Sequence, residues 1–137
     1  MGKFFKLLEP LKIGSLELRN RVVMPAMHLG MCDGGICDEK IATFYEYRAK
    51  GGVGLIIVGG CAVEKRAQGT DSMIGIYDDK FIPGLKLVTE AVHKHGGKIC
   101  AQLYHAGAYA FEQLSGEKPV SSSEIFSSLS YIINGNS

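Results

Sequence analysis

The sequence of 137 residues, with 46% hydrophobic and 21% charged side chains, has the length and composition of one folded domain, which excludes a mainly disordered chain. Its formal net charge is +1, with acidic and basic residues interspersed, so we expect neither nucleic acid nor an anionic membrane as a partner. Glu9 and Pro10 interrupt the apolar start, and no later segment approaches a membrane-spanning length. We therefore expect a cytoplasmic protein without a secretory signal or membrane span.

Residues 10–19 predict a β-hairpin that precedes the main fold, because apolar and polar side chains alternate on both sides of Gly14 and Ser15. The next apolar run, Val22–Met24, has no polar face and therefore predicts a buried parallel strand. Pro25 lacks the backbone N–H that a strand would use, so we expect this strand to end there.

Two helices, each followed by a strand, are predicted further along the chain. Their ranges are a helix over 38–50, a strand over 53–58, a helix from 82 to the glycines at 96–97, and a strand over 98–103. Asp38 is a preferred N-cap residue for the first helix, in which the spacing places Tyr45 in the core and Tyr47 on the surface. Pro83 stands early in the second helix, where its missing N–H costs little.

The unit of helix, Gly-Gly and strand occurs twice, at Gly51-Gly52 and again at Gly96-Gly97. Such alternation predicts a parallel sheet covered by helices, either open or closed into a barrel. An open nucleotide-binding or flavodoxin-like sheet needs a glycine-rich phosphate cradle directly after the first strand, where Met27, His28 and Leu29 stand instead. We therefore predict an α/β fold: the N-terminal portion of a (β/α)8 barrel, with about three βα units after the hairpin.

The four cysteines, at positions 32, 37, 61 and 100, are scattered along the chain, as is typical of a protein kept in a reducing compartment. The spacing of Cys32 and Cys37 has two interpretations, one edge of a metal or iron–sulfur site and two unconnected loop thiols. Because no second pair accompanies them, the sequence favours loop thiols and predicts no metal site.

Small or polar residues end all three predicted strands, at Met27-His28, Gly59-Gly60 and Tyr104-His105. In parallel α/β folds the carboxyl ends of strands carry the chemistry. We expect these three ends to form part of an active-site rim.

Four blocks of the sequence, in this order, closely resemble the old yellow enzyme family over about residues 5 to 125. The blocks are Leu8–Gly14, Leu18–Met27, Gly54–Gly60 and Gly97–Gly107. The resemblance is closest to the NADH:flavin oxidoreductase branch, which includes 2,4-dienoyl-CoA reductases and 2-enoate reductases. It implies an FMN-binding TIM barrel that passes a hydride from NADH or NADPH through the flavin to an activated C=C bond, with the hairpin closing the bottom of the barrel.

The resemblance also implies a set of cofactor-binding residues at the ends of the three strands: Pro25, Ala26, Met27, His28, Gly60 and Gln102. Pro25–Met27 would line the flavin ring through their backbone, and Gly60 would face the ring, because small residues allow a flat ring to approach. Gln102 would hydrogen-bond the pyrimidine edge with its amide. His28 would lie near the C4 carbonyl and N5, where a donor tunes the flavin potential.

Other histidines and one substitution are less specific signals. His105 follows the third strand, and structural and functional roles are equally compatible with it. His93 and His95 stand in the last turn of a helix, where a surface role is expected. Relatives commonly carry arginine where this chain has Ala108, so the substrate class of close relatives does not transfer directly.

By the same resemblance, residues 1–137 form one partial FMN-binding domain. It consists of the hairpin 10–19, βα units over 21–118 and a Ser-rich tail over 119–137. A whole barrel takes roughly 250 residues. The family's substrate-binding pair, proton-donating tyrosine, flavin-N1 arginine and any iron–sulfur cysteines would lie outside this sequence, so we expect no catalytic residue within it and no activity of these residues alone.

Two functions therefore stay open. The chain is either the N-terminal part of an FMN-dependent ene-reductase acting on a small activated alkene, or a non-catalytic half-barrel scaffold derived from that family. In both cases an open sheet edge favours self-association or pairing with a complementary barrel fragment.

Overall fold

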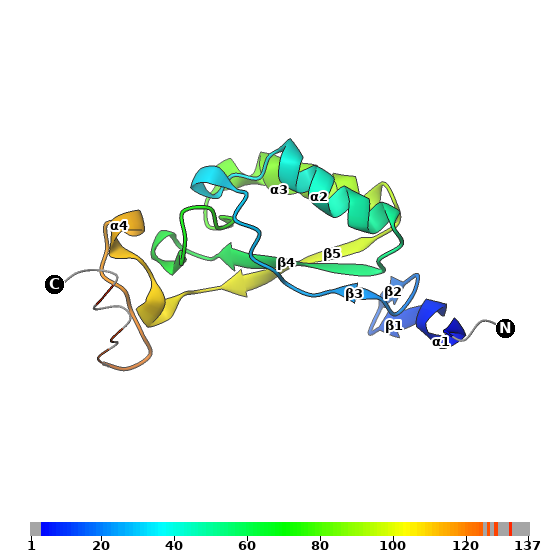
Figure 1. Cartoon of the computed structure of the whole chain (residues 1–137), viewed down its shortest axis with the longest axis horizontal. Helices are drawn as coiled ribbons and strands as arrows, with labels where there is room; N and C mark the ends of the chain where they lie inside the picture. The colour runs from blue at the N-terminus through cyan, green and yellow to red at the C-terminus, as the bar shows by residue number, and fades with distance from the viewer. Residues whose placement is uncertain (1–3, 125, 127, 129–131, 133–137) are drawn as a thin grey trace.

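The computed structural model describes residues 4–124, 126, 128 and 132 (Figure 1). Its helices and strands are α1 (Phe5–Leu8), β1 (Leu11–Ile13), β2 (Leu16–Leu18), β3 (Val23–Met24), α2 (Glu39–Lys50), β4 (Leu55–Ala62), α3 (Ile82–His93), β5 (Lys98–Tyr104) and α4 (Glu112–Ser115). Short 3-10 turns join them: η1 (Asp33–Gly35), η2 (Lys65–Ala67), η3 (Asp79–Phe81) and η4 (Gly107–Tyr109). Part of the predicted Ser-rich tail lies outside the described residues.

A parallel sheet, in the order β3–β4–β5, forms the centre of the described structure. Val23 pairs with Leu55, and Ile56 pairs with Ile99. Helices α2 and α3 lie side by side on one face of this sheet, and the α1 end and the α4 end of the molecule lie beyond opposite ends of the strands (Figure 1). Two successive βα crossovers thus place both helices on the same side, as in the outer ring of a barrel.

The predicted hairpin forms between β1 and β2, which pair antiparallel with Leu11 opposite Leu18. Gly14 turns the chain with a φ of 56°, a left-handed conformation that glycine adopts without a steric cost. Leu18 is fully buried and is followed by Arg19 and Asn20, which lead into β3. The hairpin therefore lies at the amino ends of the parallel strands, opposite the strand ends that carry candidate site residues.

Arg19 and Asn20 hold the starts of the βα units together. The Arg19 guanidinium donates to the carbonyls of Ala49, Val53 and His95, with distances of 2.8 Å to Val53 and 2.6 Å to His95. Asn20 donates from Nδ2 to the Gly52 carbonyl at 2.6 Å. A positive charge on the last carbonyls of two helices is favoured by their dipoles.

The core lies between the sheet and the two helices. The Asp38 side chain caps α2 as predicted, accepting from the Lys40 and Ile41 N–H groups. Tyr45 is 1% exposed and Tyr47 is 66% exposed, which confirms the two tyrosine assignments. From α3, Val88 and Val92 complete the same core.

The edge strands differ from the sequence expectation. Only Val23 and Met24 form β3, and Val23 is 41% exposed rather than buried on both faces. It is exposed because β3 is an edge strand with a single hydrogen-bonded neighbour, β4. At the other edge, β5 is exposed along most of its length, and Leu103 is 71% exposed.

Strand β4 also differs, because it continues to Ala62 rather than ending at Val58. The Gly59-Gly60 pair therefore lies inside the strand and not after it. The pairing with β5 shifts register between Val58 and Cys61, and Gly60 has a φ of 60°. This geometry is a β-bulge, in which β4 carries one residue more than β5 between the two paired positions. The extra residue increases the local twist and changes the direction of the neighbouring side chains.

The opposite face of the sheet carries no helix in the described part of the chain (Figure 1). After β5 the described chain forms η4 and the four-residue helix α4, which lie beyond the strand ends. None of the described helices is long and apolar enough to cross a membrane.

Candidate functional site

The three strand ends predicted to form a rim meet at one end of the sheet. The segment after β3 lies so close to the bulge in β4 that a Cβ on Gly59 would overlap the backbone of Met27. Only glycine permits this approach. Met27 itself is 45% exposed, while Pro25 is exposed and Ala26 half-buried between β3 and Met27.

Gly60 and Gln102 are brought together by the same bulge. The Gly60 N–H donates to Gln102 Oε1 at 3.2 Å, which fixes the orientation of the side-chain amide. Gln102 is exposed, and among the described residues none accepts a hydrogen bond from its Nε2. One end of the amide is thus held by the protein and the other is available as a donor.

His28 completes the rim next to Gly60. A Cβ on Gly60 would lie 4.0 Å from His28 Nδ1, and the other ring nitrogen, Nε2, hydrogen-bonds Thr70 Oγ1 at 3.0 Å. Thr70 also contacts Ser72 Oγ at 3.5 Å. The imidazole is therefore held between the end of β3 and the loop that follows β4.

The sequence reasoning missed this loop, although a signal was present. Gly69–Ser72 is a run of small and polar residues in the loop that follows a buried strand, and loops in that position of parallel folds carry site residues. Met73, at the end of the run, is 4% exposed and would lie 3.6 Å from a Cβ on Gly60. The loop thus packs directly against the bulge.

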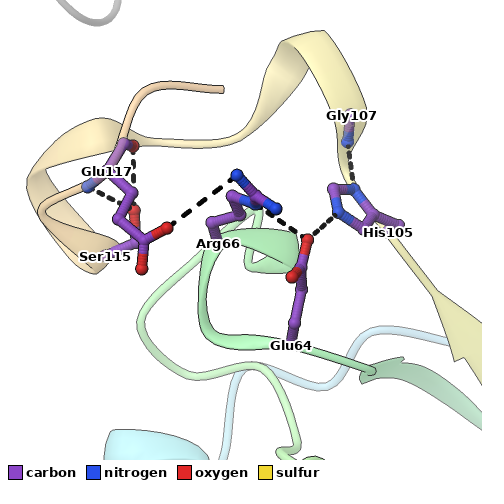
Figure 2. A network of polar contacts seen from close by, with 6 residues as sticks. All are labelled: Glu64, Arg66, His105, Gly107, Ser115 and Glu117. Atoms are coloured by element: carbon purple, nitrogen blue, oxygen red, sulfur yellow. Dashed lines mark hydrogen bonds and ion pairs between the residues drawn. The ribbon is translucent and has the colours of Figure 1, made fainter. Parts of the chain in front are cut away.

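A second polar network lies beyond the rim and joins the segments after β4 and β5 (Figure 2). Glu64 Oε1 accepts from Arg66 Nε at 2.9 Å and from His105 Nε2 at 2.7 Å. The Gly107 N–H donates to His105 Nδ1 at 2.9 Å, so Nδ1 is the acceptor and Nε2 carries the hydrogen. The backbone thereby fixes the tautomer of His105.

Opposite charges in this network shift the pKa values of its members. The hydrogen bond from Arg66, together with that from His105, lowers the pKa of Glu64, and Glu64 in turn raises the pKa of Arg66. Arg66 also reaches Glu117 with a separation of 3.9 Å between Nη1 and Oε2. Lys65 Nζ donates to the Ser115 carbonyl at 2.8 Å. The network therefore attaches α4 to the strand ends (Figure 2).

The structure brings no metal site together in the described residues, where no group of three or more His, Cys, Asp or Glu side chains is placed to hold an ion. Cys32 and Cys37 are both buried free thiols, whose sulfur atoms lie 3.7 Å apart. His95 contacts Glu46 of α2 at 2.9 Å, and His93 is exposed. None of these side chains belongs to the rim.

Comparison with known proteins assigns this chain and its fold to a family. Residues 6–132 match the family model described as NADH:flavin oxidoreductase / NADH oxidase. Among curated proteins, the chain is 46% identical over 123 residues to a metal reductase from Desulforamulus reducens, covering 90% of this chain and 18% of that protein.

Solved structures agree. An old yellow enzyme homologue from Zymomonas mobilis superposes with a TM-score of 0.82 and 30% identity over 88% of this chain and 34% of that one. Morphinone reductase, solved in complex with tetrahydroNAD, superposes with a TM-score of 0.83 and 34% identity over 89% of this chain and 34% of that one.

These relatives confirm the predicted partial barrel. The solved structures are TIM barrels, of which this chain spans about a third. The chain spans less than a fifth of the metal reductase. The chain belongs to the NADH:flavin oxidoreductase / NADH oxidase family and forms an N-terminal portion of the old yellow enzyme barrel.

Proposed function

We propose that residues 1–137 form one wall of the FMN site in an oxidoreductase that reduces activated alkenes with NADH or NADPH. The observation that carries the proposal is the meeting of Met27, Gly60 and Gln102 at the carboxyl ends of β3, β4 and β5. The family match supports flavin-dependent oxidation of NADH or NADPH, and this chain contains only part of the barrel.

The residues present fit a flavin ring. Gly60 carries no Cβ, and the nearest atoms to a Cβ placed there are 3.6 Å away or more, whereas the same side of Gly59 is filled by the Met27 backbone. A flat ring can approach a backbone position that has no side chain of its own, as at Gly60. The Nε2 group of Gln102, which donates to none of the described residues, is suited to a ring carbonyl, while Oε1 is held by Gly60. Pro25, Ala26 and Met27 would line the ring by their backbone. FMN, when bound, supplies the hydride chemistry between nicotinamide and alkene.

His28 is proposed to place a hydrogen-bond donor at the same wall. Its hydrogen bond to Thr70 at 3.0 Å fixes the ring orientation, which removes the entropy cost of ordering the imidazole when a ligand arrives. A donor held close to the flavin C4 carbonyl and N5 would stabilise charge on the reduced ring. No proton transfer to substrate is assigned to these residues.

The test pairs this chain with the rest of the barrel. We expect residues 1–137, co-expressed with the complementary barrel segment of a family member, to copurify with a yellow chromophore and to oxidise NADH or NADPH when an enone, an enoate or an enoyl thioester is added. Gln102→Ala should weaken FMN binding about tenfold through one lost hydrogen bond. The control Lys98→Ala changes the opposite end of β5 and should leave FMN binding unchanged. A colourless complex would contradict the proposal.

A second candidate is a non-catalytic half-barrel, favoured by the sheet face that carries no helix in the described part of the chain. Exposed β5 would then pair with a second copy or with a complementary fragment. For residues 1–137 alone we expect weak FMN binding or none, because the phosphate-binding strands of a barrel come late in the chain. Stoichiometric, saturating quenching of flavin fluorescence at micromolar protein would contradict that expectation.

A further inference from the structure

Two thiols outside the rim are in contact with each other. Cys32 and Cys37 stand on either side of the turn η1, and their Sγ atoms lie 3.7 Å apart. Cys32 is 0% exposed and Cys37 is 5% exposed. Both are free, so the pair is a reduced dithiol beneath a surface turn rather than two separate loop thiols.

The turn between the two cysteines is built to bring its ends together. Gly34 and Gly35 have φ angles of 60° and 81°, and the Gly35 N–H donates to the Cys32 carbonyl at 3.0 Å. A disulfide requires an S–S distance of about 2 Å, so bond formation needs the sulfur atoms to move together by less than about 2 Å. Glycines at both central positions allow the backbone to follow this movement.

The two cysteines have different surroundings. A Cβ on Gly84 of α3 would overlap the Cys37 carbonyl, so Cys37 is packed directly against a helix backbone. Cys32 instead lines a narrow crevice together with Met27, His28 and Ser72, and its N–H is 3.4 Å from the Ser72 carbonyl. The Cys37 backbone is thus fixed, but its side chain lines a cavity of about 130 Å³ together with Val58 and Cys61, so the Cys37 thiol has room to turn toward Cys32.

We propose that Cys32 and Cys37 are a peroxide-reactive dithiol that closes to a reversible intramolecular disulfide. The Cys32 sulfur attacks one peroxide oxygen, the O–O bond breaks, one water leaves and Cys32 becomes a sulfenic acid. The Cys37 sulfur then attacks the Cys32 sulfur, the S–S bond forms, the S–O bond breaks and a second water leaves. The two thiols lose two electrons and two protons, and the peroxide is reduced to two waters.

The contact also assigns the two roles. The hydrogen bond between the two thiols lowers the pKa of Cys32 and raises the pKa of Cys37. Cys61 offers a contrast, because burial raises its pKa to about 11. Since the thiolate is the nucleophile, Cys32 is the attacking cysteine and Cys37 the resolving one.

Peptide mapping tests the proposal on the unmodified chain. Trypsin cleavage after Arg21 and Lys40 yields a peptide, residues 22–40, that contains both cysteines, whereas Cys61 and Cys100 fall in other peptides. After limited hydrogen peroxide and alkylation under non-reducing conditions, we expect peptide 22–40 to lose two hydrogen atoms and to escape alkylation. Dithiothreitol should restore both thiols. Oxidation of the methionines in this peptide adds oxygen and is therefore distinguishable by mass.

Variants separate the two steps. Cys37→Ser should leave a sulfenic acid at position 32 that dimedone traps, and Cys100→Ser, which changes an exposed thiol on β5, should leave disulfide formation unchanged. The proposal is overturned if peptide 22–40 keeps two alkylatable thiols while Cys100 oxidises, or if Cys32 passes to a sulfinic acid with Cys37 still reduced. The map of the unmodified chain decides the matter even if Cys37→Ser fails to fold.

Discussion

Arg19 illustrates how a residue in a family-specific block contributes to the fold rather than to the rim. Its guanidinium donates to the carbonyls of Ala49, Val53 and His95, so one side chain fastens the end of α2, the start of β4 and the segment after α3. We predict that Arg19→Ala lowers the free energy of unfolding by about 2–3 kcal/mol, because charge-assisted hydrogen bonds to partly buried carbonyls are lost. Urea denaturation monitored by circular dichroism measures this.

Arg19→Lys is the matched variant, because lysine keeps the charge but has no planar fork of donors. It should recover only a minor part of the loss. The exposed Arg21, whose separation from Glu9 is 3.9 Å, provides a control: Arg21→Ala should change stability little. Equal stabilities of the Arg19 and Arg21 alanine variants would contradict the role given to Arg19.

The burial of Tyr45 could be predicted from the sequence, whereas the hydrogen-bond partners of Arg19 could not. The position of Tyr45 follows from helical periodicity, since Ile41, Tyr45 and Ala49 recur on one face and all three are buried. The partners of Arg19 lie 30 to 76 residues away, and no local pattern encodes them. The same holds for Thr70, whose contact with His28 spans 42 residues.

Between elements, Glu46 of α2 ties the two helices through His95 and Lys94, at 2.9 Å and 3.2 Å. The hydrogen bond from His95, with that from Lys94, lowers the pKa of Glu46 from its usual value of 4.5. The unfolded chain therefore binds the proton more readily, so this stabilisation is present above pH 4.5 and is lost as the pH falls through the lower folded value.

We predict that Glu46→Gln flattens the acid side of the stability curve. The native chain should lose melting temperature between about pH 5 and pH 3, partly through this carboxylate, and the variant should lose less over the same interval. Thermal unfolding followed by circular dichroism across that range gives the comparison. Glu39→Gln, at the exposed start of α2, serves as the control. If melting temperature falls with pH equally in the native chain and in Glu46→Gln, the proposed contribution of Glu46 to stability is refuted.

Within the sheet, the segment that follows β3 packs against the bulge in β4. Gly59→Ala would force a Cβ into the backbone of Met27, so we predict a loss of about 1–3 kcal/mol of stability from overpacking. Urea denaturation measures this loss of stability. Gly52→Ala would not serve as a control, because Gly52 has a φ of 101°, at which alanine is strained for a different reason. Ala101→Gly in the adjacent strand β5 tests whether any exchange between glycine and alanine has the same effect. If Gly59→Ala is as stable as the native chain, the close approach of Met27 to Gly59 is contradicted.

The bulge also explains why element boundaries were only partly predictable. Two glycines after an apolar run resemble the end of a strand, and the sequence predicted that end at Val58. Pairing with β5 carries β4 on to Ala62 through a register shift, and that shift depends on a partner strand about 40 residues away. The helices were predicted to within a few residues, because the N-cap Asp38 of α2 and the early Pro83 of α3 are local signals.

At the scale of the whole molecule, the described part of the chain covers one face of its sheet with helices and leaves the other without one (Figure 1). Leu103 on the edge strand β5 is 71% exposed, in a strand whose outer hydrogen-bonding edge has no partner among the described residues. Exposed edges of this kind pair with another chain unless a charge prevents it. We predict that residues 1–137 alone self-associate in a concentration-dependent manner.

Sedimentation velocity over a range from micromolar to submillimolar protein measures this association. Leu103→Lys should shift the population toward monomer, because a charge on the edge must be desolvated when two edges meet. Tyr47→Lys is the matched control, since Tyr47 is similarly exposed, at 66%, but lies on α2 on the helical side of the sheet. If both variants associate as the native chain does, the interface lies elsewhere. Adding the complementary barrel segment should suppress self-association of the native chain, because both would compete for the same edge.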